Sequence, residues 1–425
     1  MKSIWTRYVA LCLGIWLMAS SQMFNAESAK MLVSDLISGL IITVLSWCAI
    51  KETKPLAAWL LCLMGIWLQL APLIFWAPIS ASYMNDTLVG AAIIALSVVV
   101  APLASEVDSG PEIPKGWSYN PSSWAQRLPV AFLAFLAFLS ARYMASYQLG
   151  LIDKVVDPLF DKGTFYVITS NISKSFPVSD AGLGSAAYLI EALMAVKGGT
   201  RRWHTMPWMV ALFGFLVVPV GLVSILLIML QPLVVGHWCF WCLLTALFML
   251  GMIALTVDEV AASIQFLRQE VKKGKPFWNT FWKGSLGEGE ADNRSPALDE
   301  AFGKVRSAMA WGVSIPYNLV LSTLIGIWLM FSPSYLQITV STSTIDHILG
   351  ALITAVSVIS MAEVIRSFRL INIFFGLFIA ATPWVFEHND SFFWDNLIAG
   401  SFIIVLSLPK GKVLESYGNL NKFIV

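Results

Sequence analysis

The chain contains little charge. Asp, Glu, Lys and Arg make up 12% of its 425 residues and the formal net charge is +1, whereas soluble globular proteins carry about 25% charged residues. No basic domain and no dense run of Lys or Arg occurs, so nucleic-acid binding has no support. The 57% hydrophobic content indicates instead a chain that lies mostly within a membrane.

Cysteine is also scarce. The five cysteines are too few for a scaffold held together by disulfides, and they are Cys12, Cys48, Cys62, Cys239 and Cys242. Only one Cys-x-x-Cys pair occurs, so a structural zinc site has no support and we expect no metal. His237 could add one ligand, but we expect it to be an exposed turn residue.

Long apolar runs are abundant. A helix that crosses a hydrocarbon core of about 30 Å needs roughly 17–25 apolar residues, and about twelve segments qualify. They lie near 8–24, 33–50, 56–75, 86–104, 126–146, 180–196, 207–230, 236–257, 312–331, 346–364, 370–386 and 394–409. The sequence therefore predicts an all-α integral membrane protein of about twelve transmembrane helices.

The basic residues between these spans set the orientation. Nearly all of them fall on one side of the membrane if both termini are cytoplasmic, as the positive-inside rule requires. The opposite loops, such as 76–85 and 332–345, contain no Lys or Arg. The first span could alternatively be a signal peptide, because Lys2 and Arg7 precede it and small residues follow at 19–21. We favour a span, since this segment belongs to a repeat.

A short motif recurs on both sides of the centre. Gly-Ile-Trp-Leu occupies 14–17, 65–68 and 326–329, with a weaker Gly-Leu-Phe copy at 376–378. About twenty residues after each copy, a polar residue precedes a glycine by four positions. These polar residues are Asp35, Asp86, Asp346 and Asn396. We expect the glycines to allow close helix contact, a Pro to end each first helix, and the Asp or Asn to cap each returning helix.

These two-helix units resemble SPW repeats, a bacterial and archaeal membrane family named for a Ser-Pro-Trp signature. The copy at 382–384 reads Thr-Pro-Trp, and those at 332–334 and 71–73 read Ser-Pro-Ser and Ala-Pro-Leu. The first copy lacks the Pro. The resemblance covers about half the chain, near 8–104 and 312–409, and implies no known catalytic activity.

The central region contains the Cys-x-x-Cys pair, in the run His-Trp-Cys-Phe-Trp-Cys at 237–242. On a helix, Cys239 and Cys242 share one face, so their sulfurs can meet. A helix N-terminus lowers the pKa of a thiol and favours the thiolate at Cys239. The predicted topology places the pair at the outer face, where disulfide chemistry operates. Taken alone, the pair is compatible with a redox site, a metal site or chance.

The other three cysteines lie in the cytoplasmic halves of their predicted spans, far from an outer-face pair. We expect Cys12, Cys48 and Cys62 to be small buried hydrophobic residues.

The sequence around the pair resembles the vitamin K epoxide reductase family over about 117–260. The resemblance rests on Val-Ile-Thr-Ser at 167–170, the run at 176–184, Tyr188, and a four-helix pattern with a long first loop and the Cys-x-x-Cys opening the last helix. It implies that the cysteines face a quinone, which takes two electrons and two protons from the dithiol. Asp180 stands where relatives often carry an Asn near a quinone oxygen, and Tyr188 matches a recurring Tyr.

Two departures from that family stand out. Many members carry two further cysteines in the long outer loop, which relay electrons from a thioredoxin-like partner. Here loop 147–179 has no cysteine, and Thr164 stands near the place of the second. Ala246 occupies a position where some relatives have Tyr. Either a partner reaches Cys239 directly, or the module has lost or changed its activity.

Two ionisable residues lie within the central spans. Glu191 lies about 16 Å along the helix from Asp180 at 1.5 Å per residue, and Arg142 lies in the neighbouring span. Such residues are costly in a bilayer and usually face a partner or a cavity. Glu191 could feed protons to the quinone. The structural alternative, which we favour over the proton role, is a buried Glu191–Arg142 pair or an Arg142 that extends to the interface.

These observations divide the chain into five segments. Residues 1–104 and 312–425 each hold two SPW-like repeats, and 126–257 form a central four-helix domain. Residues 105–125 form a cytoplasmic linker. Residues 258–311 form another, in which the aromatic residues at 277–282 suit an interfacial helix and 284–296 read as a flexible linker.

The leading interpretation is a thiol–disulfide oxidoreductase of a bacterial inner membrane, linked to a quinone and to a thioredoxin-like periplasmic partner. Cys239 would meet the partner thiol, Cys242 would face the quinone, and Asp180 and Tyr188 would border the quinone. The alternative is a non-enzymatic membrane scaffold or binding protein that keeps the fold without the relay. A transporter has less support, since no coordination set lies at mid-membrane and no broken-helix inverted repeats are evident.

Overall fold

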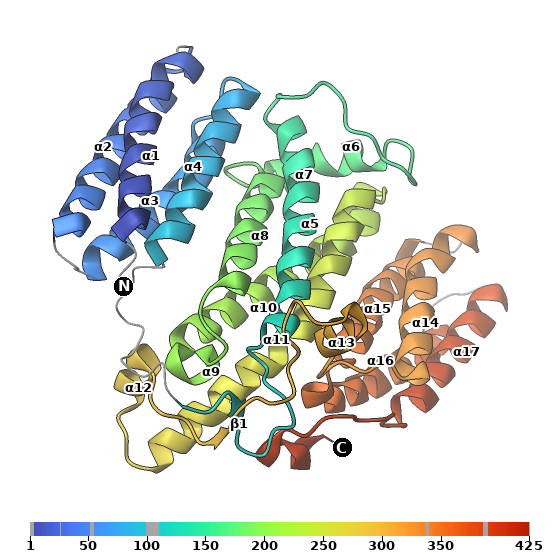
Figure 1. Cartoon of the computed structure of the whole chain (residues 1–425). Helices are drawn as coiled ribbons and strands as arrows, with labels where there is room; N and C mark the ends of the chain where they lie inside the picture. The colour runs from blue at the N-terminus through green and yellow to red at the C-terminus, as the bar shows by residue number, and fades with distance from the viewer. Residues whose placement is uncertain are drawn as a thin grey trace.

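The structure is a computed structural model that describes residues 4–25, 27–51, 55–98, 110–336, 340–385 and 390–424. Apart from one two-stranded pairing, the regular elements in these ranges are helices. They form three blocks along the chain: an N-terminal helical block, a central block and a C-terminal block (Figure 1). The predicted all-α membrane fold with a central domain between repeats is confirmed.

The N-terminal block contains two helix hairpins. Its helices are α1 (Ile4–Phe24), α2 (Ala29–Lys51), α3 (Pro55–Ile74) and α4 (Ser80–Val98). Within the second hairpin, Gly65 and Gly90 bring two backbones together, because a Cβ built at Gly65 would lie 2.8 Å from the carbonyl oxygen of Gly90. The predicted close glycine contact is therefore confirmed.

The predicted caps are wrong. Asp35 lies inside α2 and Asp86 lies inside α4, so neither residue begins its helix. Both are fully buried, and Asp35 Oδ2 accepts a hydrogen bond from Asn25 Nδ2 (2.5 Å). Ser82 Oγ donates to Asn25 Oδ1 (2.5 Å), which joins the first hairpin to the second. Asp35 therefore takes part in a contact between the two hairpins instead of beginning a helix.

The C-terminal block repeats this arrangement. Its helices are α14 (Tyr317–Tyr335), α15 (Val340–Ile359), α16 (Ile371–Val385) and α17 (Asp390–Ser407), with the 3₁₀ segment η2 (Glu363–Leu370) before α16. Asn396 Nδ2 donates to Asp346 Oδ1 (3.0 Å), so one hairpin again contacts the next. Pro333 and Pro383 lie in the last turn of α14 and α16, and each helix continues two residues further.

The central block is a bundle of four long helices. They are α5 (Trp124–Gln148), α8 (Asp180–Val196), α10 (Pro207–Leu230) and α11 (Phe240–Lys272). The long loop after α5 contains α6 (Gly163–Ile168) and α7 (Asn171–Lys174), and α9 (Arg202–Thr205) precedes α10. The π-helical turn η1 (Gln231–Val235) ends α10. Helix α11 extends to Lys272, well beyond the predicted end of the span near 257.

A polar layer covers the end of the bundle that carries α9, α12 (Phe277–Lys283) and the C-terminus, here called the inner side (Figure 1). Strand β1 (Ile113–Pro114) pairs with β2 (Gly289–Glu290), and α13 (Phe302–Met309) and η3 (Gly418–Phe423) complete this layer. Residues 284–296 therefore include a paired strand, so their interpretation as a flexible linker is wrong. We call the opposite end, with α6 and α7, the outer side.

Tyrosines and carboxylates hold the inner side together. Tyr119 donates to Asp258 Oδ2 (2.6 Å) and Tyr417 donates to Glu363 Oε2 (3.0 Å). All four side chains are buried. These contacts join the segment before α5, the extension of α11, η2 and the C-terminal tail.

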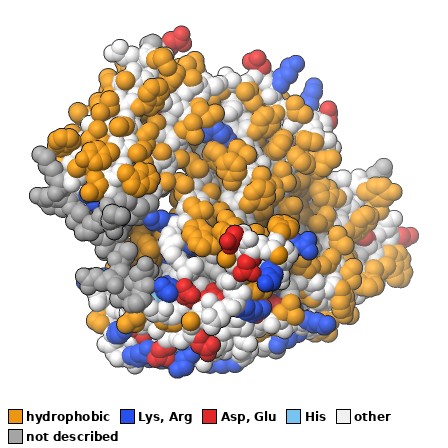
Figure 2. Space-filling view, viewed as in Figure 1, with side chains coloured by type: hydrophobic (Ala, Val, Ile, Leu, Met, Phe, Trp, Pro, Cys, Tyr) orange, Lys and Arg blue, Asp and Glu red, His pale blue; other side chains and the backbone are white. Residues whose placement is uncertain are grey.

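The lateral surface suits a lipid environment. Among the described residues, eight helices are long and apolar enough to cross a membrane, and the count of about twelve stays a prediction. Figure 2 shows hydrophobic side chains over most of the visible face, with many charged ones at the inner side and a few at the outer end. Cys12 and Cys48 are exposed on this surface, so the expectation that they are buried is wrong.

Candidate active site at the start of helix α11

The Cys-x-x-Cys pair forms the first turn of α11. Cys239 is the N-cap residue, and the backbone N–H of Cys242 donates to Cys239 Sγ (3.1 Å). This is the side-chain cap that a helix start requires, supplied here by sulfur. The backbone N–H of Cys239 in turn donates to Gln231 Oε1 (3.0 Å) in η1. The two cysteines form a disulfide with their Cα atoms 5.3 Å apart.

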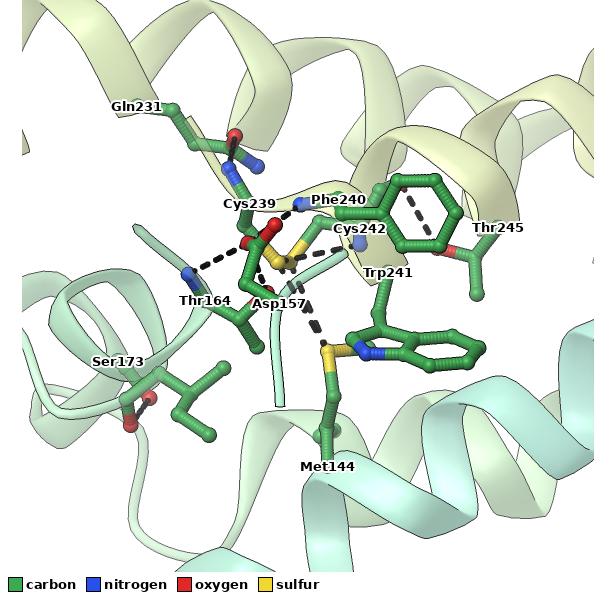
Figure 3. The surroundings of a disulfide bond; sticks show 12 residues. Met144, Asp157, Thr164, Ser173, Gln231, Cys239, Phe240, Trp241, Cys242 and Thr245 are labelled. Atoms are coloured by element: carbon green, nitrogen blue, oxygen red, sulfur yellow. Dashed lines mark hydrogen bonds between the residues drawn. A yellow bond between two sulfur atoms is a disulfide. The ribbon is translucent and has the colours of Figure 1, made fainter. Parts of the chain in front are cut away.

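The two sulfurs lie in different surroundings. Cys239 is fully buried, whereas Cys242 is partly buried and lines a cavity. Met144 Sδ of α5 lies 3.9 Å from Cys239 Sγ and 3.7 Å from Cys242 Sγ (Figure 3). The disulfide between Cys239 and Cys242 confirms the prediction that their sulfurs can meet.

The outer loop passes directly over the pair. A Cβ built at Gly163 would lie 1.9 Å from the carbonyl oxygen of Trp238, so this approach requires glycine. Trp241 Nε1 donates to the carbonyl oxygen of Val156 (2.8 Å). Loop residues 156–164 therefore cover Cys239 from the outer side.

Asp157 fastens this loop to α11. Its Oδ2 accepts hydrogen bonds from the Phe240 N–H (3.2 Å), the Thr164 N–H (2.9 Å) and Thr164 Oγ1 (2.6 Å) (Figure 3). Partial burial alone would raise the pKa of Asp157, but the hydrogen bonds from Thr164 and from backbone N–H groups lower it below its usual value. The sequence reasoning missed Asp157, although an Asp before a Pro in a loop favours this type of turn.

A cavity of about 400 Å³ lies beside Cys242, between α5, α8, α10 and α11. Its walls are mostly apolar. Polar side chains also line it, and they are Ser170, Ser173, Asp180, Tyr188, Ser224, Gln231 and Thr245. The structure thus gathers Cys242, Asp180 and Tyr188 around one cavity, while Cys239 and Glu191 are not among its lining residues.

Asp180 is held by neighbours that sequence reasoning did not identify. Its Oδ1 accepts hydrogen bonds from Gln148 Nε2 (2.6 Å), Ser173 Oγ (2.9 Å) and its neighbouring Ala181 N–H (2.9 Å). Ser179 Oγ donates to Gln148 Oε1 (2.5 Å), which fixes the orientation of the amide. No local sequence pattern marks Gln148, because it meets Asp180 only through tertiary folding.

Glu191 and Arg142 are not paired. Arg142 donates to Thr87 Oγ1 (2.9 Å) and stacks over the ring of Tyr83 at 4.3 Å, so it contacts the N-terminal block. Glu191 is fully buried, and neither carboxylate oxygen has a hydrogen-bond partner among the described residues. The proposed Glu191–Arg142 pair is therefore wrong. Within the described residues, no group of His, Cys, Asp or Glu that could hold a metal ion was found.

Comparisons with known proteins agree with this division of the chain. Residues 128–257 match the Vitamin K epoxide reductase family, and residues 4–100 and 317–410 match the SPW repeat domain. Neither a curated protein nor a solved structure matches the chain. The chain is thus a multi-pass membrane protein that carries a vitamin K epoxide reductase family domain between two SPW repeat regions.

Proposed function

We propose that this protein is a thiol–disulfide oxidoreductase that passes electrons between the Cys239–Cys242 pair and a quinone. One observation carries the proposal: the partly buried sulfur of the pair, at Cys242, borders a cavity that Asp180 and Tyr188 also line. The family match supports a membrane oxidoreductase of this class.

The cavity fits a quinone in size and chemistry. Its volume of about 400 Å³ falls in the range of roughly 300–1,000 Å³ that is typical of small-molecule sites. Apolar side chains from α8 and α10, such as Leu183, Val223 and Leu227, suit a ring with a hydrocarbon tail. A bound quinone would supply a two-electron acceptor with two carbonyl oxygens.

Cys239 and Cys242 take different parts in the proposed reaction. The N-terminus of α11 favours a thiolate at Cys239, because its partial positive charge stabilises negative charge. Cys239 would meet the thiol of a partner, and Cys242 would deliver electrons to the cavity. Formation of the S–S bond breaks two S–H bonds and releases two electrons and two protons.

Asp180 and Tyr188 would position the acceptor. Three donors converge on Asp180 Oδ1, so Oδ2 is the oxygen available to the cavity. The Tyr188 hydroxyl can donate a hydrogen bond to a carbonyl oxygen. Glu191, three residues after Tyr188 on the same helix face, would supply a proton.

The partner would act on the outer side, without an internal relay. The described outer loop has no cysteine, and Thr164 is buried against Asp157 where a relay cysteine would be expected. A thioredoxin-like protein must therefore displace residues 156–164 to reach Cys239. The distribution of Lys and Arg favours an outer side that faces the periplasm of a bacterial inner membrane.

A second candidate function is a non-enzymatic scaffold in the same membrane. The full burial of Cys239 favours it, because a buried sulfur does not exchange with a partner thiol. The redox state of the pair in cells separates the two candidates. A pair that cycles between thiol and disulfide supports the enzyme, and a pair that stays fully reduced supports the scaffold.

A steady-state assay tests the proposed enzyme directly. The protein, purified in detergent, is supplied with a dithiol and a short-chain quinone, and quinone absorbance is followed. Turnover should be lost in both Cys239→Ser and Cys242→Ser. Equal rates in wild type and both variants, all folded, would contradict the proposal.

A further inference from the structure

Glu191 occupies an unusual place in the central bundle. Tyr188, Glu191 and Ala195 follow one another at three- and four-residue spacing, so they share one face of α8. All three are buried, at 5%, 0% and 0% exposure. Tyr188 lines the cavity of about 400 Å³ beside Cys242, here called the large cavity. Ala195 lines a second, much smaller cavity. Glu191 therefore lies between two cavities.

The smaller cavity lies toward the inner side. It measures about 10 Å³, close to the size that holds one water molecule. Thr256 and Glu259 of α11 line it, and Thr256 Oγ1 is buried without a hydrogen-bond partner among the described residues. Glu259 Oε1 accepts from Ser122 Oγ (2.5 Å), and both of its oxygens bind Arg202. Ser122, Glu259 and Arg202 thus form a polar cluster at the edge of this cavity.

Helix α11 runs beside α8 between the same two cavities. Its Thr245 lines the large cavity and its Thr256 lines the small one. Between them, Met249 and Met252 pack in one core cluster with Tyr188 and Ala195 of α8. Glu191 is the buried carboxylic acid that α8 carries between Tyr188 and Ala195, beside this cluster.

A structural role explains Glu191 poorly. Its two carboxylate oxygens have no partner among the described residues, whereas Glu259 nearby is fully bonded. An unpaired carboxylate at this depth is strongly disfavoured, so the neutral acid is the favoured form. A buried carboxylic acid between two polar sites can release its proton to one site and then accept another proton from the other site. A leucine of similar size cannot do this.

We infer that Glu191 carries protons from the inner side to the large cavity, so that each turnover moves protons across the membrane. This inference rests on the proposed function. Oxidation of one dithiol sends two electrons to the quinone and releases two thiol protons at the outer side. Two other protons enter from the inner side at Thr256, pass through Glu191 and leave it toward Tyr188. The reaction balances, and for each quinone reduced two protons disappear inside and two appear outside.

The test uses the full chain in vesicles that contain a pH-sensitive dye. A membrane-impermeant dithiol and a short-chain quinone are added outside, so only molecules with an outward-facing disulfide work. Wild type should raise the lumen pH by about two protons per quinone reduced. Turnover of Glu191→Gln should fall by about 100-fold, as expected when a positioned proton donor is lost, and the residual turnover should leave the lumen pH unchanged.

A matched variant and a spectrum without turnover complete the test. Asp346→Asn alters a buried acid of the C-terminal block and should behave as wild type. Infrared spectra of the oxidised protein should contain a C=O band of a protonated acid that Glu191→Gln lacks and that shifts in D₂O. The inference is overturned if wild type reduces quinone with no change in lumen pH, or if Glu191→Gln keeps the band. If Cys242→Ser turns over as fast as wild type, the proposed function itself fails.

Discussion

At the scale of single residues, the site depends on Asp157 as much as on the cysteines. Asp157 joins the outer loop to the first turn of α11 through Thr164 and Phe240. The carboxylate also faces the N-terminus of α11, where negative charge is stabilised. One side chain therefore holds the loop closed over Cys239.

Asp157→Asn should loosen this closure. The amide keeps one acceptor oxygen but loses the negative charge, so the bonds to Thr164 and Phe240 weaken. We expect Cys239 of the reduced protein to react several-fold faster with a thiol-alkylating reagent than in wild type. Asp153→Asn, in the same loop, serves as a control and should leave the alkylation rate unchanged. A Cys239 that stays equally protected in Asp157→Asn would contradict the role of Asp157.

The pH dependence of loop closure has a defined sign. The folded-state pKa of Asp157 is lowered. Its carboxylate therefore stabilises the closed loop fully at any pH above the unfolded-state pKa of about 3.9. This stabilisation is lost as the pH falls through the folded-state pKa. We expect residues 156–164 to resist proteolysis equally at pH 7 and pH 5, and to become sensitive only below about pH 4. Loop opening already at pH 6 would exclude Asp157 as the titrating group.

Gln148 positions Asp180 without lining the cavity. Gln148→Ala removes one of three donors to Asp180 Oδ1, so the carboxylate can rotate. We expect the KM for quinone to rise several-fold, with kcat changed less. Gln269→Ala, near the inner end of α11, is the matched control. A KM equal to that of wild type would show that Gln148 serves packing alone.

At the scale of helices, the hairpins depend on glycine contacts. A Cβ at Gly65 would lie 2.7 Å from Ile94 Cγ1 and 2.8 Å from the Gly90 carbonyl oxygen. Gly65→Ala should therefore cost about 1–3 kcal/mol, visible as a lower Tm in detergent. Gly303→Ala, where no atom lies within 4 Å of the added Cβ, should leave the Tm unchanged or raise it. Equal Tm values for the two variants would contradict close packing as the role of Gly65.

The sequence predicted the helices better than their ends. Apolar run length is a local signal, so each of the twelve predicted segments overlaps a helix. Residues 99–104 of the fourth segment lie outside the described residues. The roles of Asp35 and Asp86 could not be read locally, because Asp35 bonds to Asn25, which Ser82 of another hairpin contacts in turn. The pairing of β1 with β2 was missed for the same reason, since these strands lie far apart in the sequence.

The candidate site was predicted in part. Spacing and family resemblance were sufficient to select Cys239, Cys242, Asp180 and Tyr188, because they lie within recognisable motifs. They were insufficient for the residues that hold the site in place, such as Gln148 and Met144. Those residues meet it only through the packing of α5 against α8 and α11.

At the scale of the whole molecule, the inner side joins the central and C-terminal blocks. The tail residue Tyr417 is buried against Trp117 and Tyr119 and bonds to Glu363. Burial, followed by the nearby carboxylates of Glu363 and Asp258, raises the pKa of Tyr417 far above its ordinary value.

Tyr417→Phe keeps the ring and removes the hydroxyl that donates to Glu363. We expect a loss of about 1–2 kcal/mol of stability, measured as a lower Tm, with quinone reduction little changed. Tyr317→Phe, on an exposed side chain, is the control. A large loss of turnover without a change in Tm would contradict a purely structural role.

The central claim is that the Cys239–Cys242 pair gives its electrons to a quinone held in the adjacent cavity. The most direct measurement counts protein thiols in a single turnover. Reduced protein, freed of reductant under anaerobic conditions, is mixed with one equivalent of a short-chain quinone, and free thiols are titrated before and after. The account predicts that two thiols per molecule disappear as one quinone is reduced, and that Cys242→Ser loses none. An unchanged thiol count in folded wild-type protein would contradict it.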